Sequence, residues 1–186
     1  MRRSNIFEFL NRQPAALTGK MVSLRPRKLE DCANEYTWRT DEELCRLDAS
    51  IPSSFLYAEF LDRYSIELEY PGLTFTLAID TLEGTHIGKC SLFNIDFIDN
   101  STEIGILIGE RDYWGQGYGS DAIKIFMHDI FNTSDIEKIV LRTLDWNTRA
   151  QKCFEKCGFT GSGSLMLGEY HFLVMESRRP QKPKTV

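Results

Sequence analysis

The clearest indication of a functional site comes from three glycines, Gly115, Gly117 and Gly119, which lie between a predicted strand and a predicted helix. Glycine adopts positive φ angles and lets the backbone approach a ligand without a Cβ clash. Successive N–H groups of such a loop, together with the free N–H groups and positive dipole end of the following helix, form a cradle for an anion. The segment Trp114-Gly115-Gln116-Gly117-Tyr118-Gly119-Ser120 is therefore expected to hold a pyrophosphate.

Two better-known phosphate loops do not fit this segment. A Walker A loop ends in Gly-Lys-Ser/Thr, whereas Gly119-Ser120-Asp121 has no lysine. A Rossmann fingerprint needs Gly-x-Gly-x-x-Gly and a later acidic residue at a strand end, and neither Glu137 nor Asp145 is placed that way. By itself, the triple glycine is equally compatible with a tight turn that binds no ligand. The Ser120 hydroxyl is expected either to cap the helix or to donate to a phosphate.

The cysteines and histidines do not form a metal-site or nucleophile pattern. They are Cys32, Cys45, Cys90, Cys153, Cys157, His86, His128 and His171. The number of cysteines is odd, and the closest pair, Cys153 and Cys157, lacks zinc-site spacing. The histidines are scattered, and none lies close in sequence to this pair. We therefore expect no metal ion and no covalent enzyme intermediate.

The composition is that of an ordinary globular domain, because 42% of the 186 residues are hydrophobic and 26% are charged. A net charge of −5 does not favour a nucleic-acid interface. No apolar run is long enough to span a membrane, and the charged N-terminal stretch is unlike a secretory signal. We expect a cytoplasmic protein with an N-terminal extension (residues 1–20), one domain (21–178) and a flexible C-terminal tail (179–186).

The spacing of apolar residues predicts an α+β fold. The expected helices are Leu29–Arg39, Phe55–Glu69, Ser120–Phe131 and Thr148–Cys157. The expected strands are Met21–Leu24, Leu73–Ile79, His86–Ile95, Glu103–Ile108, Lys138–Leu144, Leu165–Leu167 and His171–Glu176. This order contains an antiparallel meander followed by a strand–helix–strand crossover. It indicates a mixed central sheet of about seven strands, flanked by about four helices.

Two blocks of the sequence resemble one known family. The first is Glu103-Ile104-Gly105-Ile106-Leu107-Ile108-Gly109-Glu110-Arg111-Asp112-Tyr113-Trp114-Gly115-Gln116-Gly117-Tyr118-Gly119. The second is Asn147-Thr148-Arg149-Ala150-Gln151-Lys152-Cys153-Phe154-Glu155-Lys156-Cys157-Gly158-Phe159. They resemble the motifs of the GCN5-related N-acetyltransferases (GNAT), most closely the branch of the ribosomal-protein alanine and spermidine acetyltransferases. The resemblance spans roughly residues 21–178.

The resemblance implies an N-acetyltransferase that uses acetyl-CoA, with a splayed β-bulge strand before the glycine loop. The backbone of Ile106, Leu107 and Ile108 is expected to bind the pantetheine arm, and the N–H groups of the bulge near Leu107 to Gly109 are expected to polarise the thioester carbonyl. The loop from Trp114 to Ser120 is expected to bind the pyrophosphate. Asn147 is expected to hydrogen-bond the pantetheine arm, and Phe154 to pack near the thioester. From the residues alone, Asn147 is also a suitable helix N-cap and Phe154 a suitable core residue.

The implied mechanism is direct attack by an amine, which must first lose a proton because an alkyl ammonium has a pKa near 10. Glu103 is the expected base, since this branch carries an acidic residue at the start of the motif strand. The alternative for Glu103 is a solvated carboxylate at a strand end. Many relatives have a tyrosine at the place of Phe154 and some have a serine at the place of Ala150, so both of these proton donors are missing here.

The acceptor is expected to be a primary amine, on a protein N-terminus or on a small molecule, bound by the first two helices and their connection. That region carries Glu35, Trp38, Asp41, Glu42, Glu43 and Asp48. These residues either receive a cation or form a solvent-facing helix end. Two other functions stay open: a CoA-binding sensor or partner module without turnover, and a nucleotide-binding oxidoreductase. Small acetyltransferases of this type are often homodimers.

Overall fold

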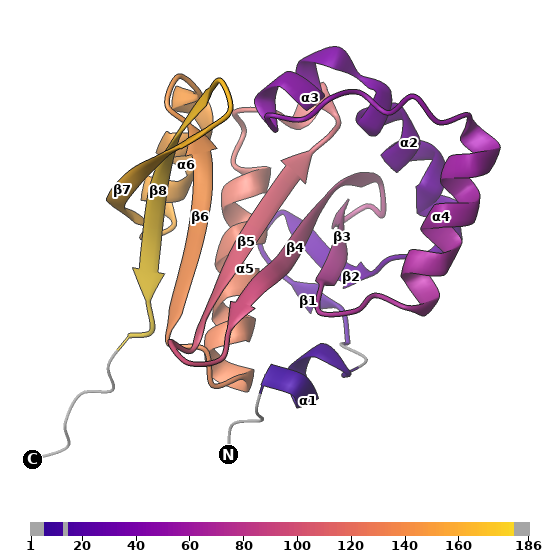
Figure 1. Cartoon of the computed structure of the whole chain (residues 1–186). Coiled ribbons are helices and arrows are strands. Elements are labelled where there is room, and N and C mark those ends of the chain that lie inside the picture. Colours follow the sequence, from indigo (N-terminus) through magenta and orange to yellow (C-terminus); the bar gives the residue numbers. More distant parts are fainter. Residues whose placement is uncertain (1–5, 13–14, 181–186) are drawn as a thin grey trace, which may run out of the picture.

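The computed structural model describes residues 6–12 and 15–180, and it places an eight-stranded sheet between two layers of helices (Figure 1). The strand order is β1-β2-β3-β4-β5-β6-β8-β7. Neighbouring strands are antiparallel except for β5 and β6, which are parallel. The predicted α+β class and mixed sheet are confirmed.

The strands match the predicted positions, with ends shifted by a few residues and one addition. They are β1 (Leu17–Thr18), β2 (Val22–Pro26), β3 (Phe75–Thr81), β4 (His86–Asp96), β5 (Ser101–Ile108), β6 (Lys138–Leu144), β7 (Thr160–Leu167) and β8 (Tyr170–Arg178). The added strand, β1, has only two residues, and a single pair of β positions is too short to produce a periodic pattern.

The helices include each predicted one and two more. They are α1 (Ile6–Leu10), α2 (Cys32–Thr40), α3 (Glu42–Leu47), α4 (Tyr57–Glu69), α5 (Tyr118–Thr133) and α6 (Thr148–Lys156), with 3₁₀ turns at Leu29–Asp31 and Arg111–Tyr113. Helix α3, which was not predicted, is separated from α2 by the single residue Asp41. The Asp41 carboxylate caps α3 by accepting the Leu44 N–H at 2.9 Å.

The sheet has two differently covered faces, because successive side chains of a strand point in opposite directions. Helix α5 covers the face that carries Cys90, Leu92 and Ile104, and these residues join its apolar side in the core. Helices α2 and α3 lie over the opposite face of β4 and β5 (Figure 1). The crossover through α5 also explains why β5 and β6 are parallel.

The predicted N-terminal extension takes part in this core. Ile6 and Phe9 of α1 are buried, and the Phe9 ring packs on Phe75 of β3 with 5.1 Å between ring centroids. Arg12 pairs with Asp129 of α5 through a hydrogen bond of 3.0 Å. Residues 15–20 also approach the sheet, since β1 pairs with β2. In the described part of the chain, this segment is therefore integral to the domain.

The C-terminal tail begins with a docked residue. Arg179 donates a hydrogen bond of 3.0 Å to the Ser134 carbonyl oxygen and pairs with Glu137 at 2.9 Å. The rest of the predicted flexible tail, residues 181–186, lies outside the described residues. None of the helices in the described ranges has the length and hydropathy that a membrane crossing requires.

Candidate active site

The site begins where β5 separates from β6. The two strands pair only at Ser101, Thr102 and Glu103 of β5, so the rest of β5 has no partner on that side. Gly109 donates its N–H to the Ile87 carbonyl oxygen at 2.8 Å on the β4 side. Because backbone groups alternate in direction along a strand, those of Ile106 and Ile108 face the opening between β5 and β6.

The predicted splay is therefore present, and the end of β5 carries a bulge. The N–H groups of Gly109 and Glu110 both donate to the Ile87 carbonyl oxygen, at 2.8 and 3.4 Å, so two residues on this side stand opposite one residue of β4. The register of β4 and β5 is regular from Gly88 opposite Ile108 to Phe93 opposite Glu103, and it shifts again between Phe93 and Asp96. The two backbones are also close at Gly88, where a Cβ atom would lie 2.1 Å from the Leu107 carbonyl oxygen. Of the N–H groups expected to polarise a carbonyl, that of Ile108 faces the opening, whereas that of Gly109 is used by β4.

A cavity of about 340 Å³, here called the first cavity, fills this opening. It is lined by Leu44, Leu47, Asp48, Ile106, Leu107, Ile108, Tyr113, Trp114, Gly115, Gly117, Gly119, Ser120, Asn147, Arg149, Ala150, Lys152, Cys153, Phe154 and Lys156. The structure thus brings both sequence blocks to one cavity. Of the residues expected to bind the cofactor, Gln116 and Tyr118 are not among the lining residues. Gln116 donates to the Asp112 carbonyl oxygen, and Tyr118 packs edge-on against Tyr113.

The glycine loop has the backbone that its sequence predicts. Gly115 and Gly117 have φ angles of 73° and 102°, in the left-handed region that disfavours other residues. Gly117 is the N-cap of α5, so this helix starts at Tyr118, two residues before its predicted start at Ser120. Ser120 therefore lies in the first helical turn and is not the cap. Its N–H belongs to the free donors at the helix N-terminus that favour an anion.

Trp114 fixes the loop against β5. Its indole N–H donates to the Ile108 carbonyl oxygen at 2.7 Å, and the Arg149 guanidinium lies 3.7 Å from the centre of its ring. The cations Arg149, Lys152 and Lys156 all reach the same cavity from α6. Positive charge and free N–H groups therefore surround the loop, as the binding of a phosphorylated ligand requires.

Asn147 and Phe154 have the structural roles that the sequence left open, and both also line the first cavity. The Asn147 Oδ1 atom caps α6 by accepting the Ala150 N–H at 3.2 Å. Phe154 is 7% exposed and packs on Phe159, with 6.1 Å between ring centroids. Neither role prevents contact with a ligand in the cavity.

A second cavity of about 310 Å³ lies on the other face of β5, under α2 and α3. Its lining residues are Glu35, Trp38, Arg39, Leu44, Cys45, Asp48, Ser50, Lys89, Ser91, Phe93, Gly105, Ile106 and Leu107. Four of these, Leu44, Asp48, Ile106 and Leu107, also line the first cavity. The two cavities therefore meet across β5 and the end of α3.

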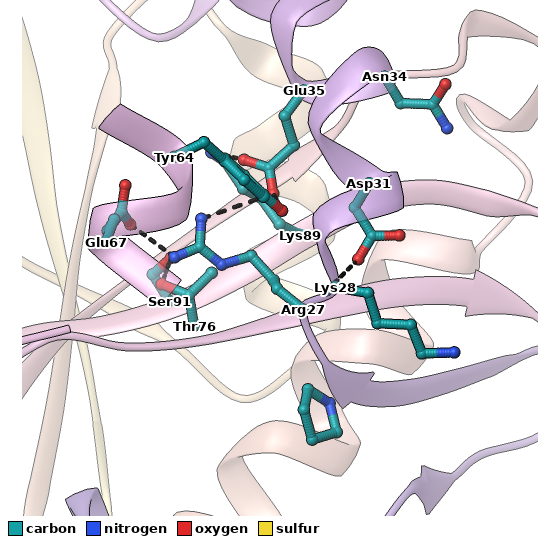
Figure 2. Close-up of polar contacts among 12 residues, drawn as sticks. Arg27, Lys28, Asp31, Asn34, Glu35, Tyr64, Glu67, Thr76, Lys89 and Ser91 are labelled. Carbon is teal, nitrogen blue, oxygen red and sulfur yellow. Dashed lines mark hydrogen bonds and ion pairs between the residues drawn. The ribbon is translucent and has the colours of Figure 1, made fainter. Parts of the chain in front are cut away.

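Two carboxylates of the second cavity have different surroundings. Figure 2 shows the buried Glu35 among three partners: it accepts the Tyr64 hydroxyl at 3.0 Å, pairs with Lys89, and has Arg27 at 3.6 Å. Asp48 sits at the rim shared by both cavities. Asp48 is an exposed residue, but the protein atoms around its carboxyl partly desolvate it and raise its pKa above the ordinary value. Arg39, Lys89 and a hydrogen bond from Ser50 oppose this shift.

The geometry does not support the predicted role of Glu103 as the base. Both oxygens of its carboxylate are occupied, because Arg142 donates to them at 2.7 and 2.8 Å and Asn94 donates at 3.0 Å. Glu103 is absent from the lining of both cavities. Such a bidentate pair holds the carboxylate in a fixed position, outside the lining of both cavities.

Helix α3 supplies site residues that the sequence did not single out for the cofactor. The first cavity is also lined by Leu44 and Leu47 of α3 and by Asp48 at its C-terminal end. These residues are far in sequence from both motif blocks. The sequence around them offers one signal, a capping residue at Asp41 followed by the apolar residues Leu44 and Cys45. This signal predicts that a helix starts here, but it does not predict where that helix lies in the fold. Among residues 6–12 and 15–180, no cluster of three or more His, Cys, Asp or Glu side chains suits a metal ion.

Comparison with solved structures finds the same architecture in acetyltransferases. Spermidine N-acetyltransferase from Vibrio cholerae, solved with CoA and spermine, has a TM-score of 0.75 at 19% identity, over 85% of this chain and 95% of that one. A GNAT-family acetyltransferase from Bacillus anthracis has a TM-score of 0.75 at 14% identity, over 89% and 99%. Aminoglycoside acetyltransferase AAC(6')-Ib, solved with coenzyme A, has a TM-score of 0.70 at 20% identity, over 85% and 95%.

The family itself is identified at the level of sequence. A search of curated proteins finds no match. The family model described as "Acetyltransferase (GNAT) domain" matches residues 22–160, which include both motif blocks, all of β5 and the glycine loop. Together with the splayed strand and the cavity beside it, this match shows that the chain belongs to the GNAT acetyltransferase family.

Proposed function

We propose that this protein transfers an acetyl group from acetyl-CoA to a primary amine by direct attack. The observation that carries the proposal is the meeting of two cavities across β5, one built by the glycine loop and one under α2 and α3. A donor in the first cavity and an acceptor in the second approach each other at Ile106 and Leu107. Holding two reactants in this way supplies much of the rate enhancement of acyl transfer.

The residues of the first cavity fit CoA. Acetyl-CoA, when bound, supplies an activated acetyl thioester. The N–H groups of the glycine loop and of the first turn of α5 suit the pyrophosphate, and Arg149, Lys152 and Lys156 add positive charge. The outward-facing backbone of Ile106 and Ile108 suits the amides of a pantetheine arm, and the Ile108 N–H is placed to polarise a carbonyl.

In this proposal, Asp48 takes the proton from the acceptor ammonium. It lies where the two cavities meet, and its raised pKa makes it a stronger base than an ordinary aspartate. Neither Phe154 nor Ala150 can donate a proton to the departing thiolate. A thiol has a pKa of only about 8.5, and the N-terminus of α6 is electropositive, so the thiolate is an adequate leaving group.

The charges of the second cavity favour an acceptor with a single positive charge. Glu35 and Asp48 are balanced there by Lys89 and Arg39, and Glu35 has Arg27 beside it as well. Two of the structural relatives above were solved with CoA, one of them also with spermine, and another AAC(6')-Ib structure contains kanamycin. A polycation of that kind meets no excess of negative charge here. We therefore favour a protein N-terminus or a small monoamine, as in the ribosomal-protein alanine acetyltransferases (RimJ/RimL-like) that the motif blocks resemble.

The alternative is a CoA-binding module without turnover, which the missing proton donors favour. The deciding experiment measures CoA binding by calorimetry, then thiol release from acetyl-CoA with monoamines, polyamines and short peptides that have free N-termini. Release with a monoamine or peptide above the hydrolysis background supports the enzyme. Binding of CoA without amine-dependent release supports the module, and release restricted to polyamines contradicts the proposed acceptor.

The remaining proposals concern location and assembly. All five cysteines are free thiols, as is usual for cytoplasmic proteins, and we propose the cytoplasm as the location. A homodimer is the proposed assembly. We propose residues 21–178 as the catalytic domain, with α1 and β1 packed on it as part of the same fold.

A further inference from the structure

Two cysteines that the proposed reaction does not use lie together at the glycine loop. Cys153 lies on α6, and Cys157, one turn further along the chain, is the C-cap of that helix. The Cys153 Sγ atom lies 3.2 Å from the Ser120 Oγ atom, and the Cys157 thiol donates to the Ser120 carbonyl oxygen at 3.5 Å. The pair therefore contacts the first turn of α5, where the proposed pyrophosphate site begins.

Cys153 differs from the other cysteines in its access to the first cavity. It is half-buried and lines that cavity, whereas Cys32, Cys45 and Cys90 are buried and do not line it. A Cβ atom on Gly119 would lie 3.7 Å from the Cys153 sulfur, so the thiol is next to the glycine loop itself. A group attached to Cys153 must therefore enter the space proposed for the cofactor.

The surroundings of Cys153 favour its thiolate. Hydrogen bonding from Cys157 and Ser120 and the positive charges of Lys156 and Lys124 lower its pKa below the ordinary value of a thiol, against the effect of burial. Burial raises the pKa of Cys32 and Cys90 instead. The cysteine whose thiolate is favoured thus also lines the first cavity, and the second thiol, that of Cys157, contacts the same residue, Ser120.

We propose that Cys153 is a site of reversible modification by low-molecular-weight disulfides and that this modification closes the first cavity to CoA. The Cys153 thiolate attacks one sulfur of the disulfide RS–SR, which forms a mixed disulfide and releases RS⁻. Cys157, after losing its proton to solvent, attacks the Cys153 sulfur, forms the Cys153–Cys157 bond and releases the second RS⁻. Two cysteines are oxidised, and one disulfide is reduced to two thiols.

The helix permits the second step. Residues four apart on an α-helix have Cα atoms roughly 6 Å apart, within the range that disulfides span. A disulfide also needs the two Cβ atoms to approach more closely than a regular helix holds them. Because Cys157 is the C-cap of α6 and not part of the helix itself, a shift of this last residue brings the sulfur atoms together while the rest of α6 stays in place. The resulting disulfide withdraws Cys153 from Ser120 and changes the wall of the cavity beside Gly119.

The test uses the full chain with glutathione disulfide as the probe and follows each cysteine by peptide mass spectrometry. We expect Cys153 to react at least about tenfold faster than Cys32, Cys45 or Cys90, which serve as controls in the same digest. Saturating CoA should slow the reaction at Cys153 by at least about tenfold, and the oxidised protein should lose CoA binding until dithiothreitol is added. Equal reaction at the buried cysteines, or no protection by bound CoA, would overturn the proposal.

Two variants separate the steps. Cys157→Ser should stop at a stable glutathione adduct on Cys153, whereas Cys153→Ser should form no adduct at either position. Circular dichroism melts establish that both variants are folded. If the wild-type protein forms the internal disulfide but Cys157→Ser forms no adduct on Cys153, the proposed order of attack is contradicted.

The inference rests on the first cavity being the CoA site, as the proposed function states. Calorimetry with CoA on the reduced protein distinguishes the two failures. If CoA does not bind the reduced protein, the proposed function fails. If CoA binds but neither protects Cys153 nor is lost on oxidation, only the present inference fails. Adduct formation itself is measured without any acetyl transfer.

Discussion

The two cavities on either side of β5 are built in different ways. The first is made mainly by two short stretches of sequence, the glycine loop with its preceding strand and the residues of α6, and three of its lining residues are glycines, which offer only backbone. The second is made by side chains from α2, the end of α3, β4 and β5, which are spread over most of the first half of the chain. A site built from backbone geometry has a local sequence signature, whereas a site built from distant side chains has none.

The cavities also differ in charge. Arg149, Lys152 and Lys156 make the first cavity cationic, which suits a phosphorylated ligand. The second is balanced, with Glu35 and Asp48 facing Arg39 and Lys89. Asp48 belongs to both, so the proposed proton acceptor stands at their boundary. If this division is correct, substitutions in the first cavity should change CoA affinity and substitutions in the second should change the preference among amines. A substitution of Asp48 should lower the rate of the chemical step.

The largest effect is expected from Asp48→Asn, which should lower kcat/KM for the amine about 100- to 1,000-fold while CoA binding stays within about twofold. The matched variant Glu103→Gln should cost less than about fivefold, because Glu103 is held by Arg142 away from both cavities. Amine-dependent thiol release and CoA calorimetry measure both quantities. The opposite ranking of the two variants would restore Glu103 as the base.

The pH dependence should follow the same assignment. Only the ionised carboxylate accepts a proton, and the pKa of Asp48 is raised, so activity should fall with decreasing pH at a higher pH than an ordinary aspartate would give. Asp48→Asn should remove this acidic limb from the kcat/KM profile. An unchanged limb in that variant would exclude Asp48 as its origin.

Gly115→Val should weaken CoA binding roughly 30- to 100-fold, or about 2 to 2.7 kcal/mol, because a β-branched residue is strained at φ of 73° and the loop must shift. Gly84→Val is the matched control. Gly84 has φ of 89°, and its Cβ would also meet open space, but it lies in the hairpin turn between β3 and β4. Equal loss of CoA affinity in both variants would show a general effect of strain.

A smaller effect is expected from Arg39→Gln, which removes one positive charge from the second cavity. The kcat/KM ratio of a polyamine to a monoamine should rise about threefold, as fits a solvent-accessible charge. Arg46→Gln is the control, since Arg46 stacks on Trp146 at 4.8 Å and lines neither cavity. A ratio that does not respond to Arg39 would place the acceptor outside the second cavity.

The smallest effect on catalysis is expected from Phe9→Ala, which lies in the core away from both cavities. Removal of this buried ring should destabilise the domain by about 3 to 5 kcal/mol in urea unfolding. At temperatures where the variant stays folded, kcat and both KM values should remain unchanged. Unfolding that is unaffected by the substitution would return residues 1–20 to the status of a separate extension.

Much of the fold and half of the site could be predicted from local patterns. The four main helices and the longer strands were predicted from the spacing of apolar residues. The positive φ angles of the loop were predicted from its glycines. Helix α3 and strand β1 were missed because six and two residues are too few for a periodic signal. Glu103 was predicted as the base from its place in the motif. Its ion pair with Arg142 could not be predicted, because it depends on the pairing of β5 with β6.

By itself, the sequence determined the order of helices and strands, the glycine loop and the two motif blocks, because each depends on residues close together in the chain. The splay of β5 was implied by the resemblance of those blocks to the GNAT family. The tertiary structure alone decided that Asp48 stands between the cavities, that Glu103 is paired, that α1 belongs to the core and that Cys153 lies beside Ser120. These features depend on which faces of distant elements pack together, and contacts of that kind leave no periodic or local trace in the sequence.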